Sequence, residues 1–331
     1  MESVIIGIES TAHTFGIGIV DLKGKIVANQ NSVYKPIAGG IHPREAAEHH
    51  SKVAAKILDE AFKKAGVAPK NIVAVAVALG PGLGPCLRVG ATVGRAIAHY
   101  LNVPLIPVNH AVAHIEIARH ITKTIDPLIV YVSGGNTVIL AFSGGRYRVF
   151  GETLDIALGN CIDVFAREVG LGFPGVPLVE EMAKQSKKFV PLPYVVKGQD
   201  VSFSGLLTAA LSIYKEKKAD LKDLCFSLIE ICYDMLTEVA ERALVHTGKR
   251  ELVLTGGVAR SPILQSKLRE MCSSHGIVFK VVPPELAGDN GAMIAYTGLL
   301  AFKCGVTIPV DRSIIRQRWR IEEVDVPWRG S

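Results

Sequence analysis

Short apolar runs and amphipathic stretches alternate along the chain, and their lengths match strands and helices. Residues 4–8, 15–20 and 25–28 predict three strands, separated by a polar tight turn and a Lys-Gly turn. The amphipathic segment 44–64 predicts a helix, and the uninterrupted apolar run 73–79 predicts a buried strand. A strand meander that continues through helices into further strands indicates an α/β fold.

The second half of the chain repeats this order. Residues 128–132, 138–142 and 147–150 again predict strand, turn, strand, turn and strand. In the first half, a loop at 80–85 is followed by a helix near 88–100 and a strand at 105–108. In the second half, a helix near 225–246 is followed by a strand at 251–254, a loop at 255–258 that opens a helix, and a strand at 278–282. The matched layout predicts two similar lobes that face each other across a cleft.

A chain of 331 residues is long enough for two such lobes. We expect an N-terminal lobe at 1–126, a C-terminal lobe at 127–310 with a helical insertion around 155–225, and a basic C-terminal tail at 311–331.

The composition is that of a globular protein, with 49% hydrophobic and 21% charged residues. No apolar run approaches the roughly 20 residues of a membrane span, and the N-terminus has no signal-peptide pattern. The six cysteines form no C-x-x-C pair, which favours free thiols in a reducing compartment. We therefore expect a cytoplasmic protein.

The net charge of +6 is compatible with an RNA partner. Five arginines and two tryptophans crowd the C-terminal segment: Arg312, Arg316, Arg318, Arg320, Arg329, Trp319 and Trp328. Arginine beside aromatic residues suits phosphate and base contacts. A solvated tail that lies across a partner subunit is the alternative.

His110 and His114 are four residues apart, so on a helix both imidazoles project from one face and are able to share a metal ion. A zinc peptidase would need His-Glu-x-x-His, but Ala111 stands where that glutamate acts as the base. Asp289 follows the last strand of the second repeat as His110 follows that of the first. The repeat therefore predicts that His110 and Asp289 converge.

Five ordered motifs carry a resemblance to a known family: Gly80 to Gly90, Asn109 to His114, Val132 to Thr137, Gly159 to Asp163 and Gly288 to Met293. In these motifs the chain resembles the tRNA threonylcarbamoyladenosine transferases of the archaeal and eukaryotic type, the catalytic subunit of the KEOPS complex. The resemblance implies two ribonuclease-H-like repeats, as in actin, sugar kinases and heat-shock ATPases. It also implies transfer of a threonylcarbamoyl group from threonylcarbamoyl-AMP to N6 of the adenosine 3′ of the anticodon, in tRNAs that read codons beginning with A.

The resemblance further implies one divalent metal per chain, held by His110, His114, Tyr131 and Asp289. Iron(II) is favoured by the family, and zinc suits the same donors. An ATP- or AMP-type nucleotide is expected to bind at Tyr131, Val132, Ser133, Gly134, Gly135, Asp163, Val176, Glu180, Gly256, Gly257 and Ser261. Glu9, beside the first turn, is a candidate to position a proton or a water.

Three residues depart from the family pattern. Val176 replaces a glycine of Pro-Gly-Gly-Pro, so its side chain would intrude on a nucleotide unless the loop shifts. Ser261 stands in place of an asparagine and offers a shorter hydroxyl. Ser10 stands where glycine is common.

The implied partners are tRNA, a small protein kinase and the other KEOPS subunits, with no membrane and no DNA. Two alternatives stay open at this stage. One is an ATPase of the actin and sugar-kinase type, and the other is a nucleotide-binding regulatory scaffold. The ATPase leaves the paired histidines unexplained, and the scaffold is suggested by the departures at Val176 and Ser261.

Overall fold

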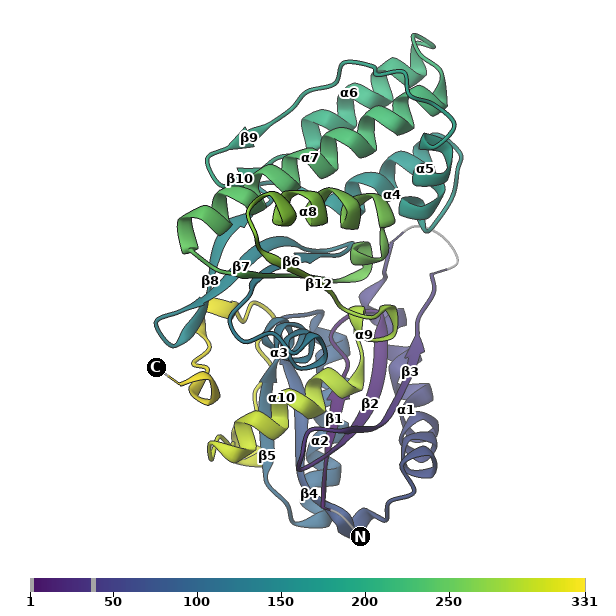
Figure 1. Ribbon diagram of the computed structural model, residues 1–331. Helices are drawn as coiled ribbons and strands as arrows, with labels where there is room; N and C mark the ends of the chain where they lie inside the picture. Colours follow the sequence, from purple (N-terminus) through teal and green to yellow (C-terminus); the bar gives the residue numbers. More distant parts are fainter. Residues whose placement is uncertain (1–2, 37–39, 331) are drawn as a thin grey trace. The chain divides into compact units, whose positions relative to one another are not determined.

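The computed structural model describes residues 3–36 and 40–330. This part of the chain contains two five-stranded sheets that share one strand order (Figure 1). The first sheet has the order β3-β2-β1-β4-β5, with β1 antiparallel to β2, β2 antiparallel to β3, and β4 parallel to both β1 and β5. Its strands are β1 (Val4–Glu9), β2 (Thr14–Asp21), β3 (Ile26–Val33), β4 (Ile72–Gly80) and β5 (Leu105–Asn109).

The second sheet has the order β12-β11-β6-β7-β8. Its strands are β6 (Leu128–Val132), β7 (Thr137–Ser143), β8 (Arg146–Glu152), β11 (Glu251–Thr255) and β12 (Val278–Val281). Here β6 is antiparallel to β7 and parallel to β11, which is parallel to β12. Counted from the first strand of each repeat, the order is third, second, first, fourth, fifth in both sheets. The predicted α/β repeat is confirmed.

The helices fall at matched places in the two repeats. In the first, α1 (Pro43–Ala65), α2 (Gly84–Leu101) and α3 (His110–Thr122) follow β3, β4 and β5. In the second, the elements before β11 are α4 (Leu158–Glu168), α5 (Gly175–Ala183), the hairpin β9 (Val196–Lys197) and β10 (Asp200–Val201), α6 (Ser204–Lys215) and α7 (Leu221–Thr247). The helices after β11 are α8 (Pro262–Ser274), α9 (Pro284–Ala287) and α10 (Gly291–Lys303). Helix α2 begins four residues before the predicted start, because a proline in the first turn suits a helix N-terminus.

The chain divides into two compact units. The first unit spans Met1–His120, Ser143–Tyr147 and Gly288–Ser331, and the second spans Ile121–Phe142 and Arg148–Ala287. Helix α10 therefore packs with the first sheet, although it follows the strands of the second repeat. The lobe boundaries expected at 126/127 and 310/311 are a division by repeat, and they remain a prediction; packing places the residues from Gly288 onward with the first unit.

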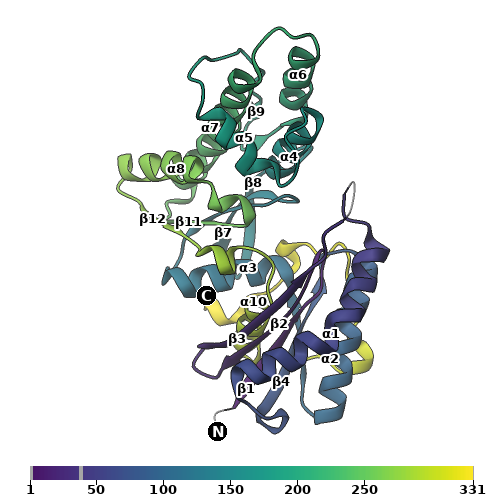
Figure 2. The same ribbon diagram turned by 90° about the vertical axis from the view of Figure 1, so that its right-hand side faces the viewer.

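Helices cover both faces of the first sheet. Side chains alternate between the faces along each strand, and the isoleucines Ile6 and Ile8 lie in one apolar cluster with α1 and α2. Gly7, between them, and Ala76 of β4 face α10: a Cβ at Gly7 would lie 2.1 Å from the Ala295 nitrogen, and a Cβ at Gly298 would lie 2.3 Å from Ala76 Cβ. Figure 2 shows α1 and α2 together beside this sheet. In the second unit, a core built around α7 covers the second sheet.

The arginine-rich C-terminal segment is packed against the first unit. Ile308 bridges to Leu105 of β5, and further along the Val326 amide donates to the Gly145 carbonyl over 3.0 Å. The Arg329 guanidinium lies 5.7 Å from the centre of the Tyr147 ring. The segment therefore belongs to the first unit along its length. Among the described residues, no helix has both the length and the apolar character that crossing a membrane requires.

Candidate metal centre and nucleotide-site residues

The metal candidates begin at the junction of β5 and α3. Asn109 ends the strand, and its side-chain Oδ1 accepts hydrogen bonds from the Ala111 and Val112 amides at 3.0 and 3.1 Å. This is the N-terminal capping geometry that asparagine favours, and it fixes where the helix starts. His110 and His114 then lie one turn apart on α3, both buried, with ring centres separated by 4.7 Å.

The junction before α10 is built in the same way. Asn290 caps α10 by accepting from the Met293 amide over 3.0 Å. Two asparagines of β3, Asn31 and Asn29, accept from the first two amides of that helix, those of Gly291 and Ala292, each over 3.2 Å. Three amide groups thus hold the helix start, and Asp289 directly precedes the capping residue.

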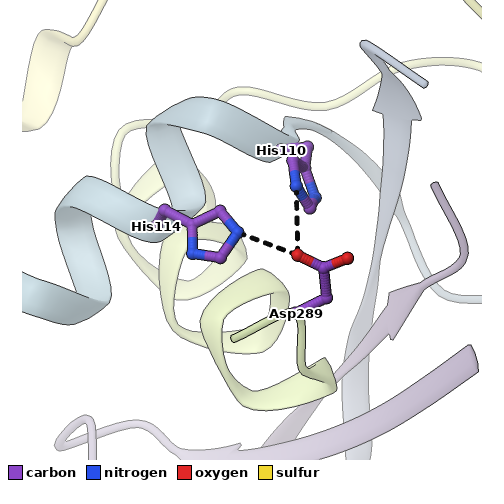
Figure 3. Close-up of side chains that lie close together, drawn as sticks. All are labelled: His110, His114 and Asp289. Carbon is purple, nitrogen blue, oxygen red and sulfur yellow. Dashed lines mark hydrogen bonds and ion pairs between the residues drawn. The ribbon is translucent and has the colours of Figure 1, made fainter. Parts of the chain in front are cut away.

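Asp289 lies between the two imidazoles (Figure 3). Its Oδ1 is 3.2 Å from His114 Nε2 and 3.5 Å from His110 Nε2. One ligand atom from each of the three residues lies within 4.8 Å of the others. Two imidazole nitrogens and one carboxylate oxygen form a donor set that suits iron(II) or zinc. The structure therefore brings together three of the four predicted ligands, all within the first unit.

Glu9 supports this cluster through His110. Its carboxylate is completely buried, and Oε2 lies 2.9 Å from His110 Nδ1. The Thr11 amide donates to the other carboxylate oxygen over 2.8 Å. A carboxylate that accepts a hydrogen bond from Nδ1 leaves the Nε2 lone pair of the same ring free to bind a metal, an arrangement common among metal-binding histidines.

Burial and charge act in opposite directions on these groups. Burial disfavours the charged form of His110, but the carboxylates of Glu9 and Asp289 outweigh it and raise the pKa of His110 to about 9. Burial also lowers the pKa of His114, although the hydrogen bond to Asp289 acts to raise it. For Asp289, the two histidines overcome the effect of burial and hold its pKa well below the usual range. Within this cluster a positive charge is therefore favoured beside Asp289.

The fourth predicted ligand, Tyr131, belongs to the second unit. It is buried near the end of β6, and its hydroxyl accepts from Asn136 Nδ2 over 3.4 Å. Val132 ends the strand, and Ser133 Oγ accepts from the Gly135 and Asn136 amides at 3.3 and 3.0 Å. Gly134 and Gly135 are exposed, with open space where a Cβ would stand. The roles of Tyr131 in metal binding and of this turn in phosphate binding remain predictions.

Asp163 and Val176 meet at the start of α5. Asp163 Oδ1 accepts from the Gly175 amide over 2.7 Å, and burial raises the pKa of this carboxyl group despite that bond. Val176 is half-buried and packs against the apolar core of the second unit. Core packing thus accounts for an apolar side chain at position 176, in the first turn of α5. Nucleotide binding by either residue remains a prediction.

Glu180 and Ser261 are directly bonded to each other. Both are buried, and Ser261 Oγ donates to Glu180 Oε1 while accepting from the Leu264 amide over 3.0 Å as the cap of α8. The Tyr233 hydroxyl donates to the same Oε1 over 2.5 Å. The shorter side chain at 261 is therefore part of a hydroxyl–carboxylate network, whose tyrosine the sequence does not indicate.

Gly256 and Gly257 follow β11 as predicted. Gly256 has φ of +97°, and a Cβ there would lie 2.2 Å from the Val132 carbonyl, so only glycine fits. Gly257 is exposed and has open space around it. The turn after β11 therefore packs closely against the backbone at the end of β6.

Three residues near the metal cluster were not predicted from sequence. His13 Nδ1 lies 3.7 Å from Asp289 Oδ2, Thr11 Oγ1 lies 3.2 Å from His110 Nδ1, and Asn109 caps α3. His13 and Thr11 belong to the polar turn between β1 and β2. Their approach to His110 and Asp289 depends on residues about 100 or more positions away.

Comparisons with known proteins agree with the motifs. A family model described as tRNA N6-adenosine threonylcarbamoyltransferase matches residues 22–296. A curated protein of that name from Thermofilum pendens is 64% identical over 326 residues, which cover 98% of this chain and 97% of that protein. One from Hyperthermus butylicus is 55% identical over 99% of this chain and 92% of that protein.

Solved structures of other proteins share the fold. The HypF protein of T. kodakarensis superposes with a TM-score of 0.64 at 16% identity, covering 92% of this chain and 48% of that chain. The activator of 2-hydroxyisocaproyl-CoA dehydratase from Clostridium difficile gives 0.54 at 14% identity, covering 91% and 96%. These likenesses support the predicted actin-type fold class. The family match and the identities, over nearly the whole chain, show that this chain belongs to the tRNA N6-adenosine threonylcarbamoyltransferase family.

Proposed function

We propose that this chain transfers the threonylcarbamoyl group of threonylcarbamoyl-AMP to N6 of the adenosine 3′ of the anticodon, in tRNAs that read codons beginning with A. Membership of the transferase family supports the reaction class. The observation that carries the site is the buried His110, His114 and Asp289 cluster, with Glu9 behind it. His110 and Asp289 lie at two helix starts that asparagine side chains fix.

The transfer replaces one bond at the carbamoyl carbon by another. The adenine N6 attacks that carbon and loses a proton, while the bond from the carbon to the phosphate oxygen breaks and AMP departs. The exocyclic amine of adenine is a weak nucleophile, so the carbonyl must be activated and the base unstacked from its loop.

His110, His114 and Asp289 would hold the divalent metal, with iron(II) favoured and zinc as the second choice. When bound, such an ion supplies Lewis acidity toward carbonyl or phosphate oxygens. Tyr131 is the proposed fourth ligand. Glu9 is a positioning residue in this scheme, because it reaches the centre only through His110.

The nucleotide part of the donor is proposed to bind in the second unit, at the residues predicted from the family pattern. Asp163 already accepts from the Gly175 amide, and Glu180 already accepts from Tyr233 and Ser261. Both carboxylates are therefore held in place before a ribose arrives. The proposed partners are tRNA, a small protein kinase and the other KEOPS subunits, and the proposed location is the cytoplasm.

The test is a transfer assay with the full chain, its proposed partner subunits, tRNA and threonylcarbamoyl-AMP. We expect His110→Ala and His114→Ala each to lower the transfer rate about 100-fold or more, since outer groups alone cost 10–100-fold at such sites. His99→Ala removes an exposed histidine of the same unit and serves as the control.

Full transfer by the His110 and His114 variants would reject a metal-dependent reaction. Retention of partner binding, with no transfer by the unaltered chain, would favour the regulatory scaffold. Donor-independent ATP hydrolysis would favour an ATPase of the sugar-kinase type.

A further inference from the structure

A short C-terminal stretch, residues 311–320, runs along the loop between β4 and α2; we call it the strap. The Arg316 amide donates to the Leu79 carbonyl over 2.7 Å, and the Gly82 amide donates to the Gln317 carbonyl over 3.2 Å. Arg95 Nε donates to Ser313 Oγ over 2.8 Å. The backbone of the strap is therefore fixed on the first unit.

Close packing leaves the strap little freedom to move. Gly80 has φ of +149°, and a Cβ there would lie 1.9 Å from the Arg316 carbonyl. The Trp319 side chain packs against the apolar core of the unit, and the Trp319 carbonyl accepts from Asn109 Nδ2 over 3.1 Å. Since Asn109 precedes His110, the strap lies in direct contact with the start of the metal-site helix.

The strap concentrates positive charge. Residues 311–320 hold four arginines and one aspartate, a net charge of +3 out of +6 for the whole chain. The arginines Arg312, Arg316, Arg318 and Arg320 are all exposed. Arg316 pairs with Glu323 over 2.6 Å and stacks on Trp319, whereas no ion pair involves the other three in the described part of the chain.

Several exposed lysines of α1, by contrast, have acidic partners close by. Lys52 pairs with Glu48, and Lys63 pairs with Asp59 on α1. Unpaired like charges on a fixed backbone repel one another, and an anionic ligand removes that cost. The planar guanidinium fork also matches phosphate oxygens closely.

We propose that the strap is a phosphate-binding surface for the tRNA substrate, with Arg312, Arg318 and Arg320 as its contacts. The proposal rests on the proposed function for the identity of the RNA. Because the strap touches Asn109, phosphates bound there lie beside the candidate centre within one unit. An acidic protein segment is the competing ligand, and the experiment separates the two.

The experiment measures tRNA binding by the full chain as a function of salt, without donor. We expect the double variant Arg318→Gln with Arg320→Gln to bind about tenfold or more weakly, with a salt slope shallower by about two. The control is Arg148→Gln with Arg250→Gln, which removes the same charge from exposed arginines of the second unit. Arg318→Lys with Arg320→Lys preserves charge and should restore much of the affinity.

Equal weakening in the strap and control variants, or unchanged binding in both, would overturn the proposal. So would a strap variant that loses only an acidic protein partner. Transfer assayed at saturating tRNA on the same preparations keeps this proposal separate from the proposed function. If the unaltered chain binds tRNA through the strap but transfers no threonylcarbamoyl group, the proposed function is rejected and the strap proposal stands.

Discussion

The side-chain amide of Asn109 donates to the main-chain carbonyl of Trp319 over 3.1 Å, so one side chain joins the start of α3 to a residue 210 positions later. The same side chain caps α3 through its oxygen. It therefore serves two roles that a substitution is able to separate.

Asn109→Asp should keep the cap and lose the bond to Trp319, because a carboxylate accepts but does not donate. We expect roughly 1–3 kcal/mol loss of unfolding free energy and a several-fold weaker metal affinity, measured by denaturation and by chelator competition. Asn109→Ala should lose more, since the cap also disappears. Asn71→Asp keeps the acceptor that Asn71 offers to Ala68 and should change neither quantity.

Glu9→Gln should weaken metal binding about 10–100-fold, because a neutral amide orients His110 less strongly than a carboxylate does. The measurement is competition with a chromophoric chelator on the purified chain. Glu116→Gln provides the matched control, since Glu116 is an equally buried carboxylate bonded to Tyr147 and Arg119. That control should lower stability and leave the affinity unchanged; equal loss of affinity in both variants would deny Glu9 a specific role.

Tyr233→Phe removes one of the two hydroxyl groups that donate to Glu180 Oε1. We expect a loss of about 1–3 kcal/mol in unfolding free energy, because the buried carboxylate keeps a single side-chain donor. Ser261→Ala should cost at least as much, as it also removes the cap of α8. Additive losses in the double variant would argue against a shared network.

His50 makes stability depend on pH. It is fully buried on α1, where its Nε2 lies 3.0 Å from the Ala12 carbonyl, and burial lowers its pKa from 6.5 to about 4 despite that contact. Between these values the unfolded chain binds more protons, so stability is complete above pH 6.5 and declines toward pH 4, by roughly 2 kcal/mol. His50→Gln should remove this part of the pH dependence in denaturant titrations, whereas exposed His99→Gln should leave it intact.

Local patterns predicted most elements, because alternation and amphipathicity report which side of a strand or helix is buried. The run 73–79 became β4, and 44–64 became α1 almost residue for residue. Matching positions in the repeats also indicated that His110 and Asp289 converge. The internal repeat was therefore informative about tertiary structure as well.

Contacts between distant segments escaped prediction. Glu9 and His110 are 101 residues apart, and nothing local marks one as the partner of the other. The sequence equally gives no sign that Tyr233 on a long apolar helix bonds Glu180, or that the strap packs on the Gly80 loop. These contacts depend on how the helices and loops pack against the sheets, and the periodicity of apolar residues along the chain does not encode that packing.

The placement of α10 in the first unit has a consequence for the time course of assembly. His114 and Asp289 are separated by 175 residues, and the whole of the second unit is synthesised between them. During synthesis, an emerging chain holds both histidines long before it holds the carboxylate. The candidate centre can therefore close only after the second unit has been synthesised and has had the chance to fold.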